Sequence, residues 1–462
     1  MPRPKPWDSY SNTLNFTTLG EFRLSTISHG PSFSRQTDSD VISGPGSYAT
    51  IGARIFSPSG NPSYLSKTIG WILDAGHDLP KDVLWILNGH WTNLIVRRDE
   101  SRRTTRCMIT HGTGDTQIQT QRGAQARALG QAGGFAYLTD FKTLEVKNLV
   151  DNGLVKAKCV HMIGSPSRTQ IHIEELRRVT KEATAADTDS DTLDTPKQVL
   201  IWELEREWCK PEQRAAMIHA ASDVDVVIMT SSDLLGFWKD IEHEMPNYGE
   251  ELKISYLTPM MLEEVNKTGQ TTTAVVIRDG KLGTLVATPE MLNAPEKFKM
   301  LPPYYREGDT MVVDTEGAGN AFAGGMGVGL VRTGDVVKAA AMGVVAESFV
   351  VEQVGIPHLE STDTGEMWND DFCSERMKKY VEMLKTSGIE LELDIIALGI
   401  QWDPDAYDDE DDEEEEEEEE EKGKGKGKEK NEKGERDDND GDDDDDDDDD
   451  DDWEVVEAEN PT

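Results

Sequence analysis

A short run of small and polar residues in the second half of the chain has the composition of an anion-binding turn. Residues 314–320 read Asp-Thr-Glu-Gly-Ala-Gly-Asn, and small apolar residues follow directly at 321–325. Glycines allow the chain to turn sharply, and the unpaired N–H groups at a helix start favour a phosphate or a developing oxyanion. The sequence therefore predicts an anion site where this turn opens into a helix.

The segments that must position this turn alternate between strand-like and helix-like patterns. Short apolar runs suit strands buried on both faces, and they occur at 160–164, 198–202, 224–229 and 273–277. Further strands are predicted at 17–27, 82–88 and 104–110. Helical patterns are found at 48–56, 169–180, 211–221, 233–242, 259–266, 319–333 and 336–351. This alternation predicts an α/β fold in which helices flank a mostly parallel sheet.

Two segments interrupt the alternation. Residues 181–196 are rich in Thr, Asp and Ala, and we interpret them as a surface insertion. Residues 111–133, rich in Gly, Gln and Thr, are interpreted as a second flexible excursion. We therefore expect an N-terminal extension over 1–16, one domain over 17–400 and a separate tail over 401–462.

Most of the negative charge of the chain lies in the tail. Residues 403–462 hold 36 acidic residues against 7 basic ones, which accounts for −29 of the chain's net charge of −43. Such a segment is too polar to bury a core, and we predict that it is disordered. Its role is either that of a solubilising appendage or that of a binding segment for basic proteins. Direct binding of nucleic acid is not expected of so acidic a segment.

The cysteines and the apolar runs bear on the compartment. The four cysteines are widely spaced and form neither a C-x-x-C pair nor a zinc pattern, so we expect reduced thiols. No apolar run approaches the roughly 20 residues that span a bilayer. We therefore expect an intracellular protein without membrane contact, located in the cytoplasm or the nucleus.

Three motifs in the right order resemble those of the ribokinase or PfkB carbohydrate kinases. Residues 314–325 resemble the family's second signature, D-T-x-G-A-G-D-x-F-x-G-G, at all but one position. Residues 43–56 resemble its first signature, a double glycine followed by a helix that ends A-R-L. Residues 278–283 are similar to a T-x-G-x-x-G turn. The resemblance implies a ribokinase-like three-layer sandwich with a small β lid, whose material lies within 17–30 and 84–150.

The chemistry implied by this resemblance is transfer of the γ-phosphoryl group of ATP, with Mg²⁺, to a sugar-like or nucleoside alcohol. In the family an aspartate at the position of Asn320 takes the hydroxyl proton, and the three preceding amides hold the developing charge. An amide cannot take a proton. The resemblance assigns Gly317, Ala318 and Gly319 to the anion hole, and Gly280, Gly283, Asp314 and Thr315 to nucleotide binding.

The departures from the family pattern fall on polar positions. Ser25 stands where the family has an aspartate that holds substrate hydroxyls, and Ser47 where it has a substrate-binding asparagine; Gly44 remains from the glycine pair. Thr230-Ser-Ser-Asp233 replaces an N-x-x-E motif that organises magnesium, so only Asp233 remains as a weak metal ligand. Arg106 either meets a substrate or phosphate or is an exposed lid residue. Asn320 also suits a helix start.

Three interpretations follow from these residues. The chain is an ATP-dependent sugar or nucleoside kinase with weakened chemistry, a nucleotide-binding pseudokinase, or a scaffold whose acidic tail binds basic partners. A looser similarity links it to a fungal branch of PfkB-like proteins named for maintenance of killer virus. The substitution Asn320→Asp is expected to raise phosphate transfer if only the base is missing.

Overall fold

The structure is a computed structural model that describes residues 14–29, 37–60, 64–110, 119–120, 134–186, 197–245, 249–267, 272–362, 364–395 and 398–399. All of them belong to one compact unit that ends at Asp403. The acidic tail predicted over 401–462 and the N-terminal segment up to residue 13 lie outside the described residues.

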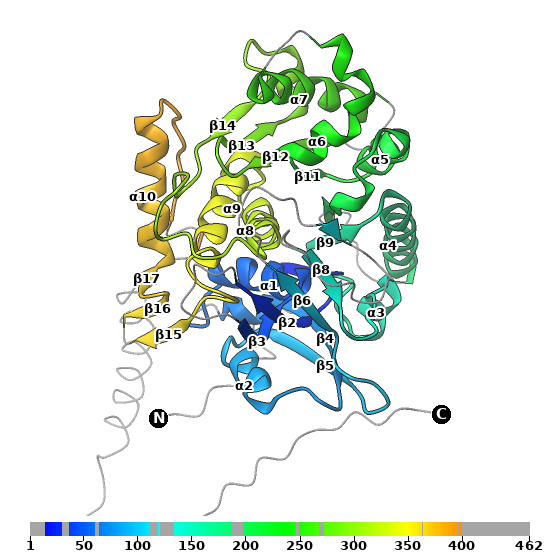
Figure 1. The fold of residues 1–462 in the computed structure, drawn as a ribbon, viewed down its shortest axis with the longest axis vertical. Helices are drawn as coiled ribbons and strands as arrows, with labels where there is room; N and C mark the ends of the chain where they lie inside the picture. The colour runs from blue at the N-terminus through cyan, green and yellow to red at the C-terminus, as the bar shows by residue number, and fades with distance from the viewer. Residues whose placement is uncertain are drawn as a thin grey trace, which may run out of the picture. The chain divides into compact units, whose positions relative to one another are not determined.

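The centre of this unit is a nine-stranded sheet with the order β14-β13-β12-β11-β10-β9-β1-β4-β5 (Figure 1). Neighbouring strands from β5 to β12 are parallel. The pairs β12–β13 and β13–β14 are antiparallel. The strands are β1 (Phe16–Thr18), β4 (Ile69–Gly76), β5 (Asn93–Asp99), β9 (Cys159–Gly164), β10 (Val199–Leu204), β11 (Val226–Thr230), β12 (Ala274–Asp279), β13 (Gly283–Ala287) and β14 (Lys299–Leu301). The mostly parallel sheet predicted from the sequence is therefore confirmed.

Helices cover both faces of this sheet, because its strands bury alternate side chains on opposite sides. Within β11, Val226 and Ile228 join one hydrophobic cluster, whereas Val227 and Met229 join the other. The first cluster is covered by α1 (Pro45–Ile55), α8 (Ala318–Thr333), α9 (Val336–Val350) and α10 (Cys373–Thr386). The second is covered by α3 (Val146–Asp151), α4 (Pro166–Ala186), α5 (Arg214–Ala221), α6 (Ser231–Phe237) and α7 (Glu250–Asn266). The result is the predicted three-layer sandwich.

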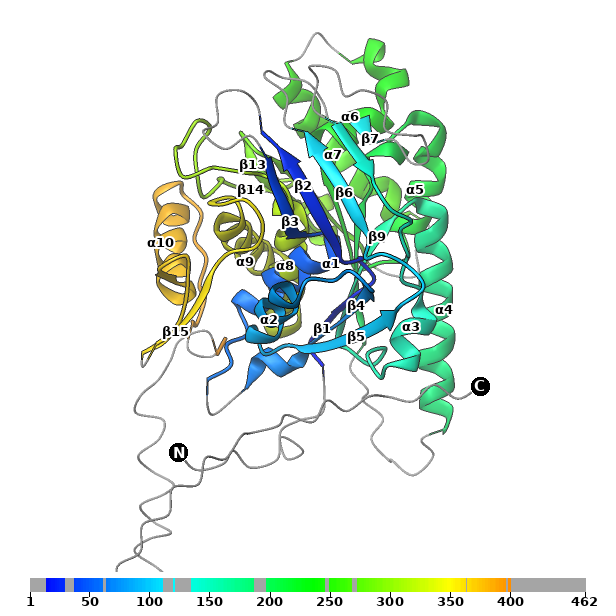
Figure 2. The same ribbon diagram turned by 60° about the horizontal axis from the view of Figure 1, so that its bottom comes forward.

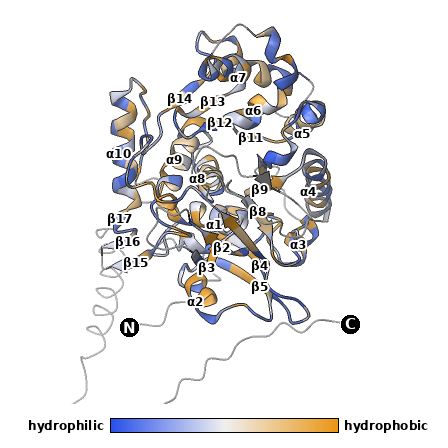
Figure 3. Ribbon diagram, viewed as in Figure 1, coloured by the Kyte–Doolittle hydropathy of each residue, from blue (hydrophilic) through white to orange (hydrophobic). Residues whose placement is uncertain are grey.

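The hydropathy of the helices follows their positions in these layers. The central α8 and α9 are rich in apolar residues, whereas the peripheral α4 and α10 carry many polar ones (Figure 3). Small residues allow α8 to approach α1 closely: a Cβ on Gly324 would lie 1.9 Å from the carbonyl oxygen of Ala49. The small-residue stretch of α8 is thus explained by close packing of helices.

A second, five-stranded sheet has the order β3-β2-β6-β8-β7 and corresponds to the predicted β lid (Figure 2). Its strands are β2 (Arg23–Ser28), β3 (Thr37–Ser43), β6 (Arg106–Thr110), β7 (Gln119–Thr120) and β8 (Gly134–Tyr137). A third, antiparallel sheet contains β15 (Leu359–Thr362), β16 (Gly365–Trp368) and β17 (Asp371–Phe372). Short 3₁₀ helices are η2 (Leu65–Thr68), η3 (Arg206–Trp208), η4 (Pro211–Gln213), η5 (Lys239–Glu244) and η6 (Pro289–Asn293).

One predicted strand is wrong. Residues 82–88 belong to the helix α2 (Lys81–Gly89), which buries Val83 and Leu87 four residues apart and leaves Trp85 exposed. That burial has the period of a helix, which the continuous apolar run concealed. The strands of this region are instead β4, which is buried along its whole length, and β5.

Several predicted boundaries also differ from the structure. The strand expected over 17–27 is two strands, β1 and β2, which belong to different sheets. The helix expected from Pro259 begins at Glu250, because Ile254 and Leu257 extend its buried face toward the N-terminus. Of the predicted insertion over 181–196, the first six residues continue α4, and the remainder lies outside the described residues.

Candidate functional site

The predicted anion site lies at the start of α8. Gly317 is the N-cap and has left-handed backbone angles, φ 77° and ψ −8°, and no side chain caps the helix. A Cβ on this residue would lie 2.2 Å from the ring of the buried Tyr48. Glycine is therefore required here both by the backbone and by its neighbour. Apart from the Ala318 N–H, which donates to the carbonyl oxygen of Thr315, the first N–H groups of this 16-residue helix remain available to an anion.

Asn320 lies in the first turn of α8 and contacts a carboxylate that the sequence analysis did not single out. Its Nδ2 donates to Glu203 Oε2 at 2.7 Å. Asn320 thus lies at the helix start, as predicted, but Gly317 occupies the cap position and the Asn320 amide donates to Glu203. The position of the family's aspartate is thus an amide bound to a glutamate.

Glu203 is the end of a chain of hydrogen bonds across three neighbouring strands. His161 Nε2 lies 3.2 Å from Glu203 Oε2, and Thr18 Oγ1 lies 2.9 Å from His161 Nδ1. Thr18 Oγ1 also accepts the N–H of Gly20 at 2.9 Å. Thr18 and His161 are fully buried, whereas the Glu203 side chain is 14% exposed. The Glu203 carboxylate is therefore hydrogen-bonded to buried side chains and is also partly exposed to solvent.

A guanidinium group lies at the same turn. A Cβ on Gly319 would be 2.7 Å from Arg278 Nη1 and 2.9 Å from Glu203 Oε1. Arg278 binds Glu347, with Nε 3.2 Å from Oε2, and lies 5.1 Å from the centre of the Phe322 ring. Burial raises the pKa of the Glu347 carboxyl, although Arg278 acts in the opposite direction. Gly319 at the helix start therefore lies close to the Arg278 guanidinium, which is paired with Glu347, and to the Glu203 carboxylate.

The residues before Gly317 shape the turn. Asp314 is buried, and its Oδ1 accepts the N–H of Glu316 at 3.0 Å. Thr315 is exposed, and its carbonyl oxygen accepts the N–H of Ala318 at 3.3 Å. Asp314 thus holds the loop that leads into the helix. Nucleotide binding by these two residues stays a prediction.

The turn at 278–283 joins β12 to β13 as an antiparallel hairpin. Asp279 Oδ1 accepts the N–H groups of Lys281 and Leu282, both at 2.9 Å, and its Oδ2 accepts the hydroxyl of Ser231 at 2.6 Å. Gly283 has φ 95°, and a Cβ there would meet a backbone oxygen at 2.1 Å, whereas a Cβ on Gly280 would meet nothing within 4 Å. Only Gly283 is required by the hairpin, so Gly280 is the glycine with room for a ligand.

The predicted substrate residues are directed into the protein. Ser25 is buried, and its Oγ lies 3.0 Å from Cys107 Sγ and within hydrogen-bond reach of Ser43. The buried Ser47 donates to the carbonyl oxygen of Ser43 at 2.7 Å. Gly44 caps α1 with φ 98°. Both hydroxyls are therefore engaged within the chain.

Arg106 lies on β6 in the lid sheet and is 17% exposed. Its Nε donates to Asp78 Oδ2 at 3.0 Å, and its Nη1 pairs with Asp40. The same Asp78 accepts the N–H of Thr104 at 2.6 Å. The ion pair with Asp78 joins the lid to the segment that follows β4, whereas the pair with Asp40 on β3 lies within the lid sheet. A contact with substrate or phosphate stays a prediction.

A charged group next to the anion site was missed by the sequence analysis. Arg23 Nη2 donates to Glu316 Oε1 at 3.2 Å, and Arg23 Nη1 lies 3.5 Å from Glu21 Oε1. Tyr137 donates to the same Glu21 oxygen at 3.0 Å. The hydroxyl of Tyr48, whose ring packs on Gly317, is buried and has no hydrogen-bond partner among the described residues. Because these residues are scattered over the chain, no motif marked them.

Asp233 belongs to the capping box of α6, in which Thr230 is the N-cap. Its Oδ2 accepts the N–H of Thr230 at 3.0 Å, and its own N–H donates to Thr230 Oγ1 at 3.2 Å. Its Oδ1 lies 3.7 Å from Arg206 Nε. Among the residues that the structure describes, no group of three or more His, Cys, Asp or Glu side chains could hold a metal ion. A carboxylate so engaged does not fit a magnesium ligand.

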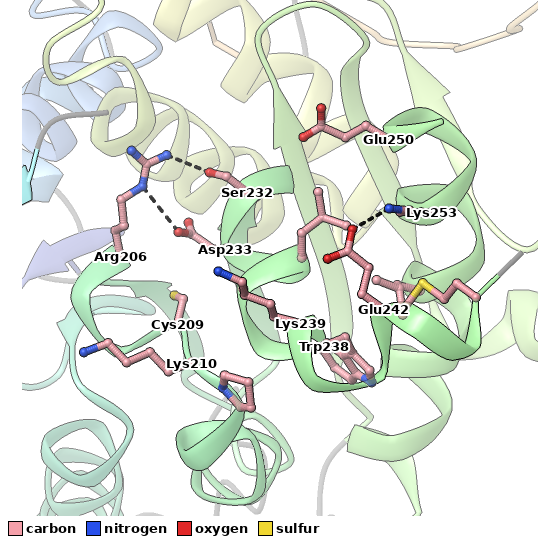
Figure 4. A pocket seen from close by; sticks show the side chains of 15 residues that line it. Arg206, Cys209, Lys210, Ser232, Asp233, Trp238, Lys239, Glu242, Glu250 and Lys253 are labelled. Atoms are coloured by element: carbon pink, nitrogen blue, oxygen red, sulfur yellow. Dashed lines mark hydrogen bonds and ion pairs between the residues drawn. The ribbon is translucent and has the colours of Figure 1, made fainter. Parts of the chain in front are cut away.

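A pocket of about 590 Å³ lies beside Asp233 (Figure 4). Arg206, Lys210 and Lys239 bring positive charge to it, while Glu242 on its other side pairs with Lys253. None of the residues at the start of α8 lines this pocket. The pocket is therefore distinct from the turn that carries the anion site.

Two further expectations concern the cysteines and the membrane. All four cysteines are buried and free of disulfide bonds. Within the described part of the chain, no helix combines the length and the apolar character needed to cross a membrane.

The fold and the site together identify a class of protein. The model of the pfkB family of carbohydrate kinases matches residues 93–362, more than half of the chain. An adenosine kinase from Schistosoma mansoni, solved with 2-fluoroadenosine, has a TM-score of 0.51 and 12% identity, covering 75% of this chain and 97% of that one. The chain belongs to the pfkB family of carbohydrate kinases.

Within that family the chain is similar to two fungal proteins. An uncharacterized protein of Schizosaccharomyces pombe is 28% identical over 389 residues, which cover 82% of this chain and 95% of that protein. Protein MAK32 of Saccharomyces cerevisiae is 25% identical over 361 residues, covering 77% of this chain and 88% of that protein. The predicted resemblance to a PfkB-like, Mak-type fungal protein is confirmed.

Proposed function

We propose that this protein is an ATP-dependent phosphotransferase that phosphorylates the hydroxyl group of a sugar-like or nucleoside-like compound. The observation that carries the proposal is the start of α8, where free helix N–H groups, the Arg278 guanidinium and the Glu203 carboxylate meet around Gly319. Phosphoryl transfer depends on positioning and on stabilising charge on the transferred group. The family membership supplies the reaction class, and an intracellular site, in the cytoplasm or nucleus, suits it.

Each residue at this site has a separate role in the proposed reaction. The N–H groups of Gly317 and Gly319 would bind the γ-phosphate, and that of Ala318 would join them on leaving the carbonyl oxygen of Thr315. Arg278 would neutralise charge that builds up there. Gly280, Asp314 and Thr315 would lie along the nucleotide. Any Mg²⁺ would enter with the phosphate groups, because the described carboxylates form no site of their own.

The test is ATP binding followed by turnover. Isothermal titration with MgATP should give a measurable heat, and Arg278→Met should weaken binding about tenfold or more through the lost charge–phosphate interaction. The matched control is Arg178→Met, which removes an exposed arginine paired with Glu182 on α4. A folded wild-type protein that gives no heat with MgATP contradicts the proposal.

A second candidate is a nucleotide-binding pseudokinase, and Ser25 and Ser47 favour it. Both hydroxyl groups form hydrogen bonds within the chain, so this candidate assigns them no contact with a neutral sugar. This candidate predicts ATP binding without phosphate transfer or hydrolysis. A thermal-shift screen with sugars and nucleosides separates the two, because only a kinase gains stability from an acceptor.

We also propose that the acidic tail binds basic protein partners, on the ground of its net charge of −29. Deletion of residues 401–462 should abolish capture of histone-like basic proteins and leave the melting temperature of the remainder unchanged. Capture that persists after the deletion contradicts this role.

A further inference from the structure

We propose that Glu203 is the catalytic base of this protein and replaces the carboxylate that the family carries at the position of Asn320. This inference rests on the proposed phosphotransferase function and deepens it. Glu203 lies at the end of β10, 117 residues before Asn320 in the chain, and the two side chains are joined by a hydrogen bond of 2.7 Å. A carboxylate therefore lies within hydrogen-bond distance of the position at which the family has its aspartate.

The hydrogen bonds determine which oxygen of Glu203 is available. Oε2 accepts from Asn320 Nδ2 and, when His161 carries its proton on Nε2, from the ring of that histidine. The ionised Glu203 carboxylate favours this tautomer because it can only accept, and His161 Nδ1 then accepts the hydroxyl proton of Thr18, whose oxygen also accepts the Gly20 N–H. Every partner is satisfied in this arrangement. Oε2 is held, and none of the hydrogen bonds found among the described residues involves Oε1.

Oε1 faces the anion site. It lies 2.9 Å from the place that a Cβ of Gly319 would occupy, so a larger residue there would displace it. Arg278 Nη1 lies on the same side of Gly319. An acceptor hydroxyl group bound at this turn would meet the carboxylate, while a phosphate would meet the helix N–H groups and the guanidinium. The arrangement provides a proton acceptor beside a phosphate site.

The step balances with ATP as the phosphate donor. As the acceptor oxygen forms its bond to the γ-phosphorus, the hydroxyl proton passes to Glu203 Oε1. The bond between the γ-phosphorus and the β–γ bridging oxygen breaks, and ADP leaves with the electron pair. The proton then passes from Glu203 to solvent, which the 14% exposure of the side chain permits. Asn320 and His161 position the carboxylate and do not exchange protons with the substrate.

The first test is Glu203→Gln. It should lower the turnover of MgATP, measured with ribose, adenosine and water as acceptors, by about 10²–10⁴-fold, the usual contribution of a general base. Binding of MgATP by titration should change by less than about threefold. The fall in rate of the wild type at acidic pH, which reports the base, should be absent from the residual activity of the variant. Glu182→Gln, an exposed glutamate on α4, is the matched control.

The second test exchanges the two side chains. The double variant Glu203→Gln with Asn320→Asp reverses the hydrogen bond and returns the carboxylate to position 320. It should recover at least tenfold of the activity lost in Glu203→Gln. Melting temperatures of all variants verify folding, and the exchange keeps the test valid if Glu203→Gln alone is unstable.

The outcomes separate this inference from the proposed function. A wild type that turns over ATP while Glu203→Gln keeps the same rate overturns the role of Glu203 and leaves the function standing. A folded exchange variant that binds ATP and remains as slow as Glu203→Gln also counts against Glu203. A wild type that binds ATP without transfer to any acceptor, water included, overturns both and favours the pseudokinase.

Discussion

The start of α8 and the lid sheet differ in how they have departed from the family pattern. At the start of α8 the glycine residues of the family pattern are present, and the Glu203 carboxylate on β10 lies within hydrogen-bond distance of Asn320. In the lid sheet and the adjoining start of α1, the buried hydroxyl groups of Ser25 and Ser47 form hydrogen bonds within the chain, and Arg23 on β2 forms ion pairs. The first region thus keeps a carboxylate beside the substituted position, whereas the hydroxyl groups of the second are engaged within the chain. Under the proposed function, this difference predicts that phosphate binding is retained and that the acceptor is altered.

The largest effect is expected at the glycine frame. Gly317→Ala should lower the free energy of unfolding by about 2–4 kcal/mol, because the residue has φ 77° and a Cβ would enter the ring of Tyr48. Chemical denaturation measures the loss. Gly280→Ala is the control, since a Cβ there meets nothing within 4 Å, and it should change stability by less than about 0.5 kcal/mol. An equal loss of unfolding free energy in both variants would contradict the requirement for glycine at position 317.

The next effect concerns Asn320→Asp by itself. The sequence alone predicts a gain of activity, but the structure places this side chain 2.7 Å from the Glu203 carboxylate. Two carboxylates at hydrogen-bond distance repel unless they share a proton. The variant should therefore lose about 1–3 kcal/mol of stability at neutral pH, show no gain in turnover, and recover stability as the pH falls. Denaturation at pH 5 and pH 8 measures this, and higher stability at pH 8 would refute it.

The lid should depend on pH through Asp78. Burial would raise the pKa of this carboxyl, but hydrogen bonds from Thr104, Arg106 and Arg103 lower it well below its ordinary value of 3.8. A group with a lowered folded-state pKa stabilises the fold above its unfolded value, and that stability is lost as the pH falls below about 4. Asp78→Asn should cost on the order of 1 kcal/mol at pH 7 and weaken the acid dependence. An unchanged acid limb would show that other carboxylates dominate it.

The smallest effect is expected at Ser25. Because its hydroxyl bonds to Ser43 and Cys107 inside the lid, Ser25→Ala should lower stability by about 1 kcal/mol and leave the KM for any acceptor unchanged. A rise in that KM without a change in melting temperature would instead place Ser25 in the acceptor site, as the family pattern implies. Ser25 would then contact the acceptor, and the lid would keep the family's substrate-binding role at this position.

Local patterns predicted much of the framework. The apolar runs that form β9 to β12 were recognised because strands buried on both faces read as continuous apolar segments. The apolar run at 82–88 predicts a strand but forms a helix, because so short a run is compatible with both the helical and the strand period. The ion pairs of Arg23 and Arg106 could not be predicted, because their partners are far away in the chain.

The sequence by itself determined the α/β architecture, the glycine turn at 314–320 and the absence of a carboxylate at Asn320. These follow from local spacing and residue type. Only the tertiary structure decided that Glu203 stands against Asn320 and that Ser25 and Ser47 face inward. Both depend on which strands become neighbours, and β1, β9 and β10 are brought together from distant segments by the burial of their apolar side chains.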